Sequence, residues 1–260
     1  MKYDQYQVSA FTSRQFGGNP AAVVPLQQWL ATETMQLIAA ENNLSETAFY
    51  VAEGEGYGLR WFTPQVEVDL CGHATLATAH VLFNELNTSA DELRFQTRSG
   101  ELRVTRRGEH IQMDFPAYEV VDAALDTAIC KALGGSAGAA HESSFWLYRF
   151  DTEAQVRALT PDFRALLAAS DRPVIATAPG DDVDFVSRFF GPQVGIDEDP
   201  VTGSAHCALV PLWAQLLDKQ QLSALQVSDR VGELDCELDG ERVVMRGQGL
   251  TFLRGQITVL

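Results

Sequence analysis

The stretch CGHATLATAHVLFNEL at residues 71–86 carries the strongest fold signal in the chain. It predicts a helix from Gly72 to Leu86 that is small or apolar on almost every side, which is typical of a helix enclosed by other structure. A second stretch, GSAHCALVPLWAQLL, predicts an enclosed helix of the same kind from Gly203 to Leu217. The two helices begin 131 positions apart in a chain of 260 residues. Self-similarity at half length favours two like-built domains, although two glycine-started helices also fit an α+β protein without a repeat.

Short strand-like runs bounded by Gly, Pro or Asn surround both helices. In the first half, strands are expected at residues 6–11, 21–24, 47–52, 59–62, 93–97, 101–105 and 110–115, with a helix over 29–40. After Pro116 the pattern restarts, with helices over 122–133 and 153–167 and strands at 145–150, 174–178, 224–227, 232–238, 242–246 and 251–259. We therefore expect domains at residues 1–118 and 119–260, with the final strand, about residues 250–260, returning to the first domain.

The charge balance excludes several classes of partner. The chain has 19 Lys and Arg residues against 35 Asp and Glu residues, a formal net charge of −16. That charge repels nucleic-acid phosphates and anionic lipid surfaces, so neither is an expected partner. No run approaches the roughly 18 apolar residues of a membrane span, and the first residues do not resemble a secretory signal. A cytoplasmic protein is expected, with its four widely spaced cysteines as reduced thiols.

The starts of the two enclosed helices are candidate anion sites. A helix N-terminus presents unpaired backbone N–H groups and the positive end of the helix dipole, and Gly72 and Gly203 would let a ligand approach that backbone closely. Thr202 and Ser204 could supply hydroxyl donors, with Asp199 beside them. The same hydroxyl residues are also common N-caps, so capping alone could explain them.

Glu46 and His73 are the candidate acid/base residues. Glu46 lies between a helix end and an apolar strand, where a carboxylate can act as a general acid or base, although a solvated strand end would explain it equally well. His73 follows the first helix start and could shuttle a proton or be only structural. No metal is expected, because His73 and His80 lack a further ligand at a supporting spacing. No cofactor is expected either, since the three lysines lack a pyridoxal-phosphate context and a dinucleotide fingerprint is missing.

Four motifs together resemble the PhzF-like phenazine-biosynthesis family. They are AFT at residues 10–12 with FGGNPAAVV at 16–24, NLSETAF at 43–49, RWFTP at 60–64 running on to CGHATLA at 71–77, and EDPVTGSAH at 198–206. They follow one another in the family's order, which is far more specific than any single motif.

The resemblance implies a diaminopimelate-epimerase-like fold. Such a fold is α+β, with two similar domains related by a pseudo-two-fold axis, each a curled, barrel-like, mostly antiparallel sheet around a central helix, and an active site in the cleft between them. It also implies a cofactor-independent, biosynthetic isomerase, expected to be a homodimer, that moves a proton on a small carboxylated substrate. By position, the catalytic residues of the family match Glu46, His73 and Asp199. The substrate-binding residues match Asn19, Gly72, Thr202, Gly203 and Ser204.

One departure separates the chain from amino-acid epimerases of the same fold. The resemblance implies that those enzymes need a cysteine at each of the two helix starts. Here Cys71 precedes the first helix, but Pro200 is expected at the corresponding place before the second. Two alternatives therefore stay open: a two-base epimerase or racemase in which Cys71 works against Asp199, and a non-catalytic member that binds a small acid. Cys71 could also be a small buried residue.

Overall fold

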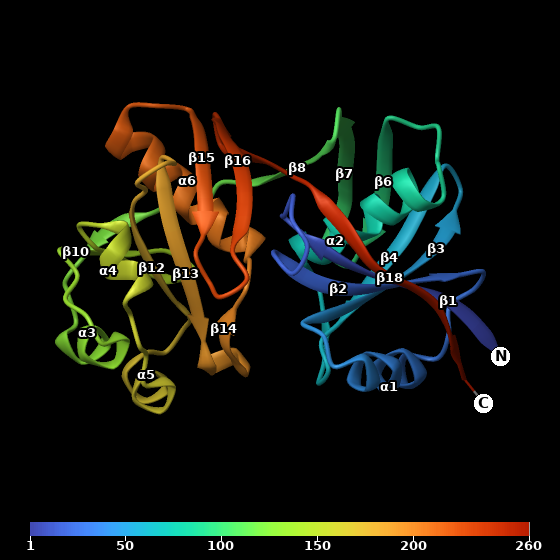
Figure 1. The fold of residues 1–260 in the computed structure, drawn as a ribbon, viewed down its shortest axis with the longest axis horizontal. Coiled ribbons are helices and arrows are strands. Elements are labelled where there is room, and N and C mark those ends of the chain that lie inside the picture. Colours follow the sequence, from blue (N-terminus) through green and yellow to red (C-terminus); the bar gives the residue numbers. More distant parts are fainter. Residues whose placement is uncertain (260) are drawn as a thin grey trace. The chain divides into compact units, whose positions relative to one another are not determined.

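The structure is a computed structural model that describes residues 1–259, and the chain forms two compact units (Figure 1). Unit 1 contains Met1–Asp114 together with the described residues from Arg246 onward, and unit 2 contains Phe115–Met245. Within the described residues, no helix is both long enough and apolar enough to cross a membrane.

Unit 1 is built on a curled sheet. Its strands are β1 (Lys2–Ala10), β2 (Asn19–Leu26), β3 (Glu46–Glu53), β4 (Gly56–Phe62), β5 (Glu67–Val68), β6 (Glu92–Thr97), β7 (Gly100–Arg107), β8 (His110–Pro116) and β18 (Gly249–Thr258). The strands pair in the order β18–β1–β2–β3–β4–β6–β7–β8, with β5 beside β4; only β2–β3 and β4–β6 are parallel. The last strand of the chain, red in Figure 1, thus lies along the first strand, in blue.

Helix α2 (Gly72–His80) fills the inside of this sheet. Its residues from His73 to His80 are all buried, and the helix packs on β1, β2, β3 and β18. A single π-helical turn, η1 (Val81–Glu85), continues it, so the predicted segment is helical almost to its end. On the opposite side of the sheet, α1 (Thr32–Asn42) buries Met35, Ile38 and Ala39 against β2, β3 and β4.

Unit 2 has its own curled sheet. The strands are β9 (Val121–Ala123), β10 (Ala139–Glu142), β11 (Trp146–Arg149), β12 (Val174–Pro179), β13 (Phe185–Gly191), β14 (Ile196–Asp199), β15 (Gln221–Gln226), β16 (Gly232–Asp239) and β17 (Arg242–Gly247). Pairing runs β9–β10–β11–β12–β13–β15–β16, with β14 beside β13; in this series β11–β12 and β13–β15 are parallel pairs and the others are antiparallel. The long apolar helix α6 (Gly203–Leu217) packs on β15 and β16.

The two units repeat the same order of pairings. From β1 to β7 in unit 1 and from β10 to β16 in unit 2, antiparallel and parallel pairs alternate, beginning and ending with an antiparallel pair. In each unit the buried helix, α2 or α6, comes directly before the strand that completes the second parallel pair, apart from the short turn η1 after α2. This confirms the predicted fold class of two similar, mostly antiparallel sheets, each around a central helix, and explains why α2 and α6 resemble each other in sequence.

Two predicted helices of unit 2 are partly wrong. The segment predicted as helical over 122–133 begins with β9, and only α3 (Thr127–Leu133) is helical, because the Asp126 side chain accepts the Ala128 N–H at 2.7 Å and starts the helix there. The segment over 153–167 divides into α4 (Glu153–Arg157) and α5 (Phe163–Ala169). Pro161 lies between them and cannot continue a helix.

Candidate functional site

Asn19, Glu46 and His73 come together at one edge of the sheet of unit 1. Strands β2 and β3 are parallel neighbours, so their first residues, Asn19 and Glu46, lie at the same edge. His73, in the first turn of α2, places Nε2 at 2.9 Å from Glu46 Oε2 and Nδ1 at 3.3 Å from Asn19 Nδ2. All three side chains are buried, and Asn19 is fully so. Two residues predicted for acid/base roles therefore touch each other in a water-poor setting.

The imidazole of His73 lies between a carboxylate and a thiol. Cys71 Sγ is 3.5 Å from Nδ1, on the ring edge away from Glu46. Burial alone would lower the pKa of His73, but interactions with Cys71 and Glu46 outweigh it and hold the pKa well above its ordinary value. Burial, and then Glu46, raise the pKa of the Cys71 thiol. The protonation of the thiol and that of the imidazole are therefore coupled.

The same residues are the one group in the described part of the chain with the make-up of a metal site. One donor atom from each of Glu46, Cys71 and His73 lies within 4.8 Å of the other two. However, His73 meets Glu46 with one ring nitrogen and Cys71 with the other. Because a different ring nitrogen of His73 meets each neighbour, the geometry suits proton transfer along the group.

Asp199, Thr202, Gly203 and Ser204 come together in unit 2. Strand β14 ends at Asp199 and α6 begins at Gly203, so all four residues lie within one short segment. Asp199 and Thr202 are buried, and the Thr202 hydroxyl donates to Asp199 Oδ2. This hydroxyl therefore does not cap α6. Capping by Thr202, one of the two explanations that the sequence left open, is wrong.

At both enclosed helices the N-cap residue leaves the first turn without a side-chain cap of its own. Within the described residues, neither α2 nor α6 receives a side-chain cap. Cys71 and Thr202 stand at the N-cap positions in extended conformations, each directly before a glycine. Thr202, and not Pro200, stands directly before the first glycine of α6, and Pro200 lies two residues earlier. A helix start without a cap can bind an anion.

Two buried residues that the sequence did not predict hold this segment of unit 2. The Gln226 amide bonds to Asp199 and Thr202, and His206 Nδ1 donates to the Thr202 carbonyl at 2.9 Å. Burial lowers the pKa of His206 to about 4, so its ring is neutral at neutral pH. His206 could have been found from its place in the EDPVTGSAH motif, whereas Gln226 lies in an ordinary strand with no sequence signal.

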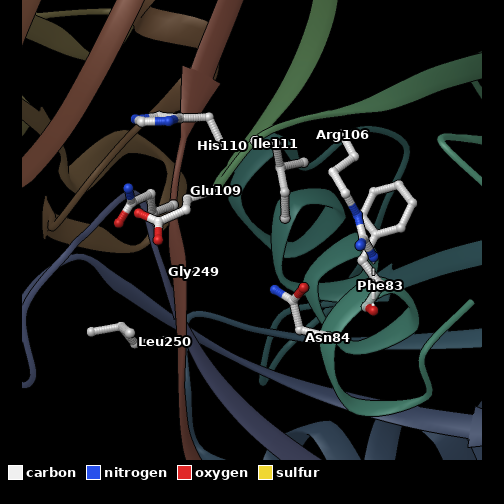
Figure 2. Close-up of a pocket in the computed structure, with 10 residues that line it drawn as sticks. Phe83, Asn84, Arg106, Glu109, His110, Ile111, Gly249 and Leu250 are labelled. Atoms are coloured by element: carbon white, nitrogen blue, oxygen red, sulfur yellow. Dashed lines mark hydrogen bonds between the residues drawn. The ribbon is translucent and has the colours of Figure 1, made fainter.

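A separate pocket of about 430 Å³ lies within unit 1, and no predicted site residue lines it (Figure 2). The Arg106 guanidinium in this pocket lies 4.5 Å from the centre of the Phe83 ring, and Nη2 donates to the Phe83 carbonyl at 2.8 Å. The cation that would attract an anionic ligand is therefore engaged by its own unit.

Comparisons with known proteins point to one family. The family model described as phenazine biosynthesis-like protein, PhzC-PhzF, matches residues 8–255. An uncharacterized isomerase of Pseudomonas aeruginosa is 51% identical, with 99% of each chain covered. The crystal structure of a PhzF-family phenazine biosynthesis protein from Enterococcus faecalis is 47% identical, with a TM-score of 0.98 and 100% of each chain covered. A hydroxyproline epimerase from Agrobacterium vitis shares the fold at 12% identity and a TM-score of 0.61, covering 98% of this chain and 92% of that one.

Proposed function

Because the chain belongs to the PhzC-PhzF family of phenazine biosynthesis-like proteins, as its motifs predicted, we propose that it is a cofactor-independent isomerase that moves a proton on a small carboxylated substrate. The observation that carries the proposal is the buried contact of 2.9 Å between Glu46 and His73, beside the uncapped start of α2. The isomerase name of the relative from Pseudomonas aeruginosa supports the same reaction class.

Glu46 is the proton carrier in this mechanism. Its carboxylate removes a proton from carbon, which leaves an enolate-like carbanion, and the resulting carboxylic acid returns the proton to another carbon on the same face of the substrate. His73 lies 2.9 Å from the Glu46 carboxylate and positions it for the transfer. Asp199, held by the Thr202 hydroxyl, assists reprotonation or balances the developing charge.

The helix starts supply the anion binding. The backbone N–H groups that follow Gly72 and Gly203 bind the substrate carboxylate and the developing negative charge, and the Ser204 hydroxyl adds a donor. We assign Asn19 a different role from direct substrate binding, because its fully buried amide faces His73 and can orient that ring. Thr202 likewise acts on Asp199 and not on the substrate.

The test is solvent-deuterium incorporation. The chain is incubated in D₂O with a panel of 2-amino, 2-hydroxy and unsaturated carboxylic acids, and exchange of carbon-bound protons is followed by NMR. Glu46→Gln should reduce the exchange rate by about 10²-fold or more, since it removes the acid/base group. Glu53→Gln is the matched control, because Glu53 lies at the other end of the same strand, where it accepts the Trp29 N–H at 2.9 Å. Full exchange by Glu46→Gln would contradict the assignment.

The contact between Cys71 and His73 favours one rival, a two-base epimerase in which Cys71 supplies the second base. Cys71→Ala distinguishes the two. A single-glutamate isomerase should keep its exchange rate within a few fold, whereas a two-base enzyme should lose about 10²-fold or more. Cys236→Ala, which removes another buried thiol from unit 2, controls for the loss of packing.

A further inference from the structure

The side-chain amide of Gln226 is used entirely on the segment from Asp199 to Thr202. Gln226 is fully buried at the end of β15. Its Oε1 accepts the Thr202 backbone N–H at 2.8 Å, and its Nε2 donates to the Asp199 carbonyl at 2.8 Å and to Thr202 Oγ1 at 3.2 Å. One side chain therefore holds both ends of the turn that leads into α6.

These bonds determine where the Thr202 hydroxyl proton points. A hydroxyl has one proton, and an ionised carboxylate can only accept. Since the Gln226 N–H donates to Thr202 Oγ1, the hydroxyl proton is directed to Asp199 Oδ2. The result is a chain of donors from Gln226 through Thr202 to Asp199, in which a charge-assisted hydrogen bond holds the carboxylate in one orientation.

The support for Gln226 is rigid on its other side. In β15, Gln226 lies opposite Ser187 of β13 and Gly232 of β16, so its backbone is inside the sheet of unit 2. His206 Nδ1 donates to the Thr202 carbonyl from α6. Thr202 is thus held at its backbone N–H, its carbonyl and its hydroxyl, and each contact comes from a buried residue.

We propose that Gln226 is a positioning residue of the isomerase, which directs the Thr202 hydroxyl proton onto Asp199 and holds the start of α6 for substrate. The proposal rests on the proposed function, in which Asp199 and the α6 helix start act on a small carboxylate. Gln226 itself does not touch the substrate.

Two substitutions of similar length separate its roles. Gln226→Met removes all three hydrogen bonds, and we expect the exchange rate of the acid selected from the panel to fall about 10- to 100-fold, because small displacements of reacting groups have effects of this size. Gln226→Glu keeps an acceptor but loses the donor, so the Thr202 hydroxyl turns to residue 226. At pH 8 the exchange rate of Gln226→Glu should fall further than that of Gln226→Met. The difference should shrink as the pH falls, because the introduced carboxyl at position 226 can donate again once it is protonated.

Gln193→Met is the matched control. Gln193 also joins two backbone carbonyls in unit 2, those of Leu166 and Ser170 at 3.3 and 3.2 Å, but it bonds to no residue of the proposed site. It should leave the exchange rate unchanged. A readout that needs no substrate is backbone hydrogen–deuterium exchange of the peptide over residues 199–205, which should speed up in Gln226→Met and not in Gln193→Met.

The outcomes distinguish this proposal from the proposed function. If Asp199→Asn is inactive while Gln226→Met is fully active, the positioning role is overturned and the proposed function stands. If Gln226→Met and Gln226→Glu lose the same activity with the same pH profile, the residue acts only by packing and the positioning role is again overturned. If Asp199→Asn keeps full activity, the proposed role of Asp199 fails first, and the role of Gln226 fails with it.

Discussion

The two buried histidines near the helix starts differ in pKa because their neighbours differ. His73 faces a carboxylate, and its pKa is held well above the ordinary value, since the contacts with Cys71 and Glu46 outweigh the effect of burial. His206 donates to a backbone carbonyl, and burial lowers its pKa to about 4. A histidine with a raised pKa beside Glu46 and a neutral donor beside Thr202 suit the different tasks proposed for unit 1 and unit 2.

The lowered pKa of His206 predicts a loss of stability in acid. Its folded pKa of about 4 lies below the ordinary value of 6.5, so the unfolded chain binds the proton more readily, and stability falls as the pH decreases from about 6.5 toward 4. Between pH 7 and pH 5 this group should remove about 2 kcal/mol from the free energy of unfolding of unit 2.

His206→Asn tests this estimate, because the Asn amide can still donate to the Thr202 carbonyl but does not titrate. Urea unfolding of the variant should show a smaller loss between pH 7 and pH 5 than the parent chain, by about 2 kcal/mol. His110→Asn, at a half-buried histidine of unit 1, is the comparison substitution. Equal losses in the parent chain and in His206→Asn would rule out His206 as the titrating group.

Among the secondary structure elements, β16 approaches the proposed site segment of unit 2 closely at Gly232. A Cβ added at Gly232 would lie 2.2 Å from Cγ2 and 2.7 Å from Cγ1 of Val201. Val201 therefore packs directly on the glycine backbone, between Asp199 and Thr202. The need for glycine here comes from this close approach and not from an unusual backbone angle.

Gly232→Ala should consequently damage activity by moving the segment from Asp199 to Thr202. We expect a loss of about tenfold or more in deuterium exchange, together with a destabilisation of about 1–3 kcal/mol from overpacking. Gly255→Ala is the control, because a Cβ there meets its nearest neighbour, Leu253 Cδ2, at an ordinary 3.5 Å. Normal exchange by Gly232→Ala would show that the segment tolerates displacement.

How well an element could be predicted depends on what its residues contact. The bounds of α6 follow from its sequence, because its apolar residues and its first glycine are local signals. Strand β13 was not predicted, since Arg188 interrupts its apolar run; in the structure that guanidinium makes two hydrogen bonds of 2.8 Å to Glu198. The contact of Glu46 with His73 could not be predicted from their spacing in the sequence. The motifs indicated that both residues have acid/base roles, but not that they touch. Gln226 was missed because its partners are distant in sequence.

At the scale of the whole molecule, unit 1 requires both ends of the chain. Strand β18 pairs with β1 from Lys2 to Ala10, and the Val259 N–H donates to the Met1 carbonyl at 2.9 Å. The paired helices predicted two similar halves, because each half repeats one local pattern. The sequence led us to expect the last strand in the first half, but its partner strand and register are decided by non-local contacts, which a local pattern does not encode. The homodimer stays a prediction, which sedimentation can test.

The overall charge has its own consequence for an anionic substrate. The net charge of −16 repels a carboxylate at long range, whereas the helix N–H groups attract it only at contact distance.

Salt screens the long-range repulsion first, because the Debye length falls from about 30 Å at 0.01 M to about 10 Å at 0.1 M. Raising KCl over this range should therefore increase kcat/KM for the acid selected from the panel by about two- to fivefold, with little change in kcat. The neutral amide of the same acid, followed by deuterium exchange, should show no salt dependence. A kcat/KM that falls with salt would mean that local positive charge, and not the net charge, governs capture of the substrate.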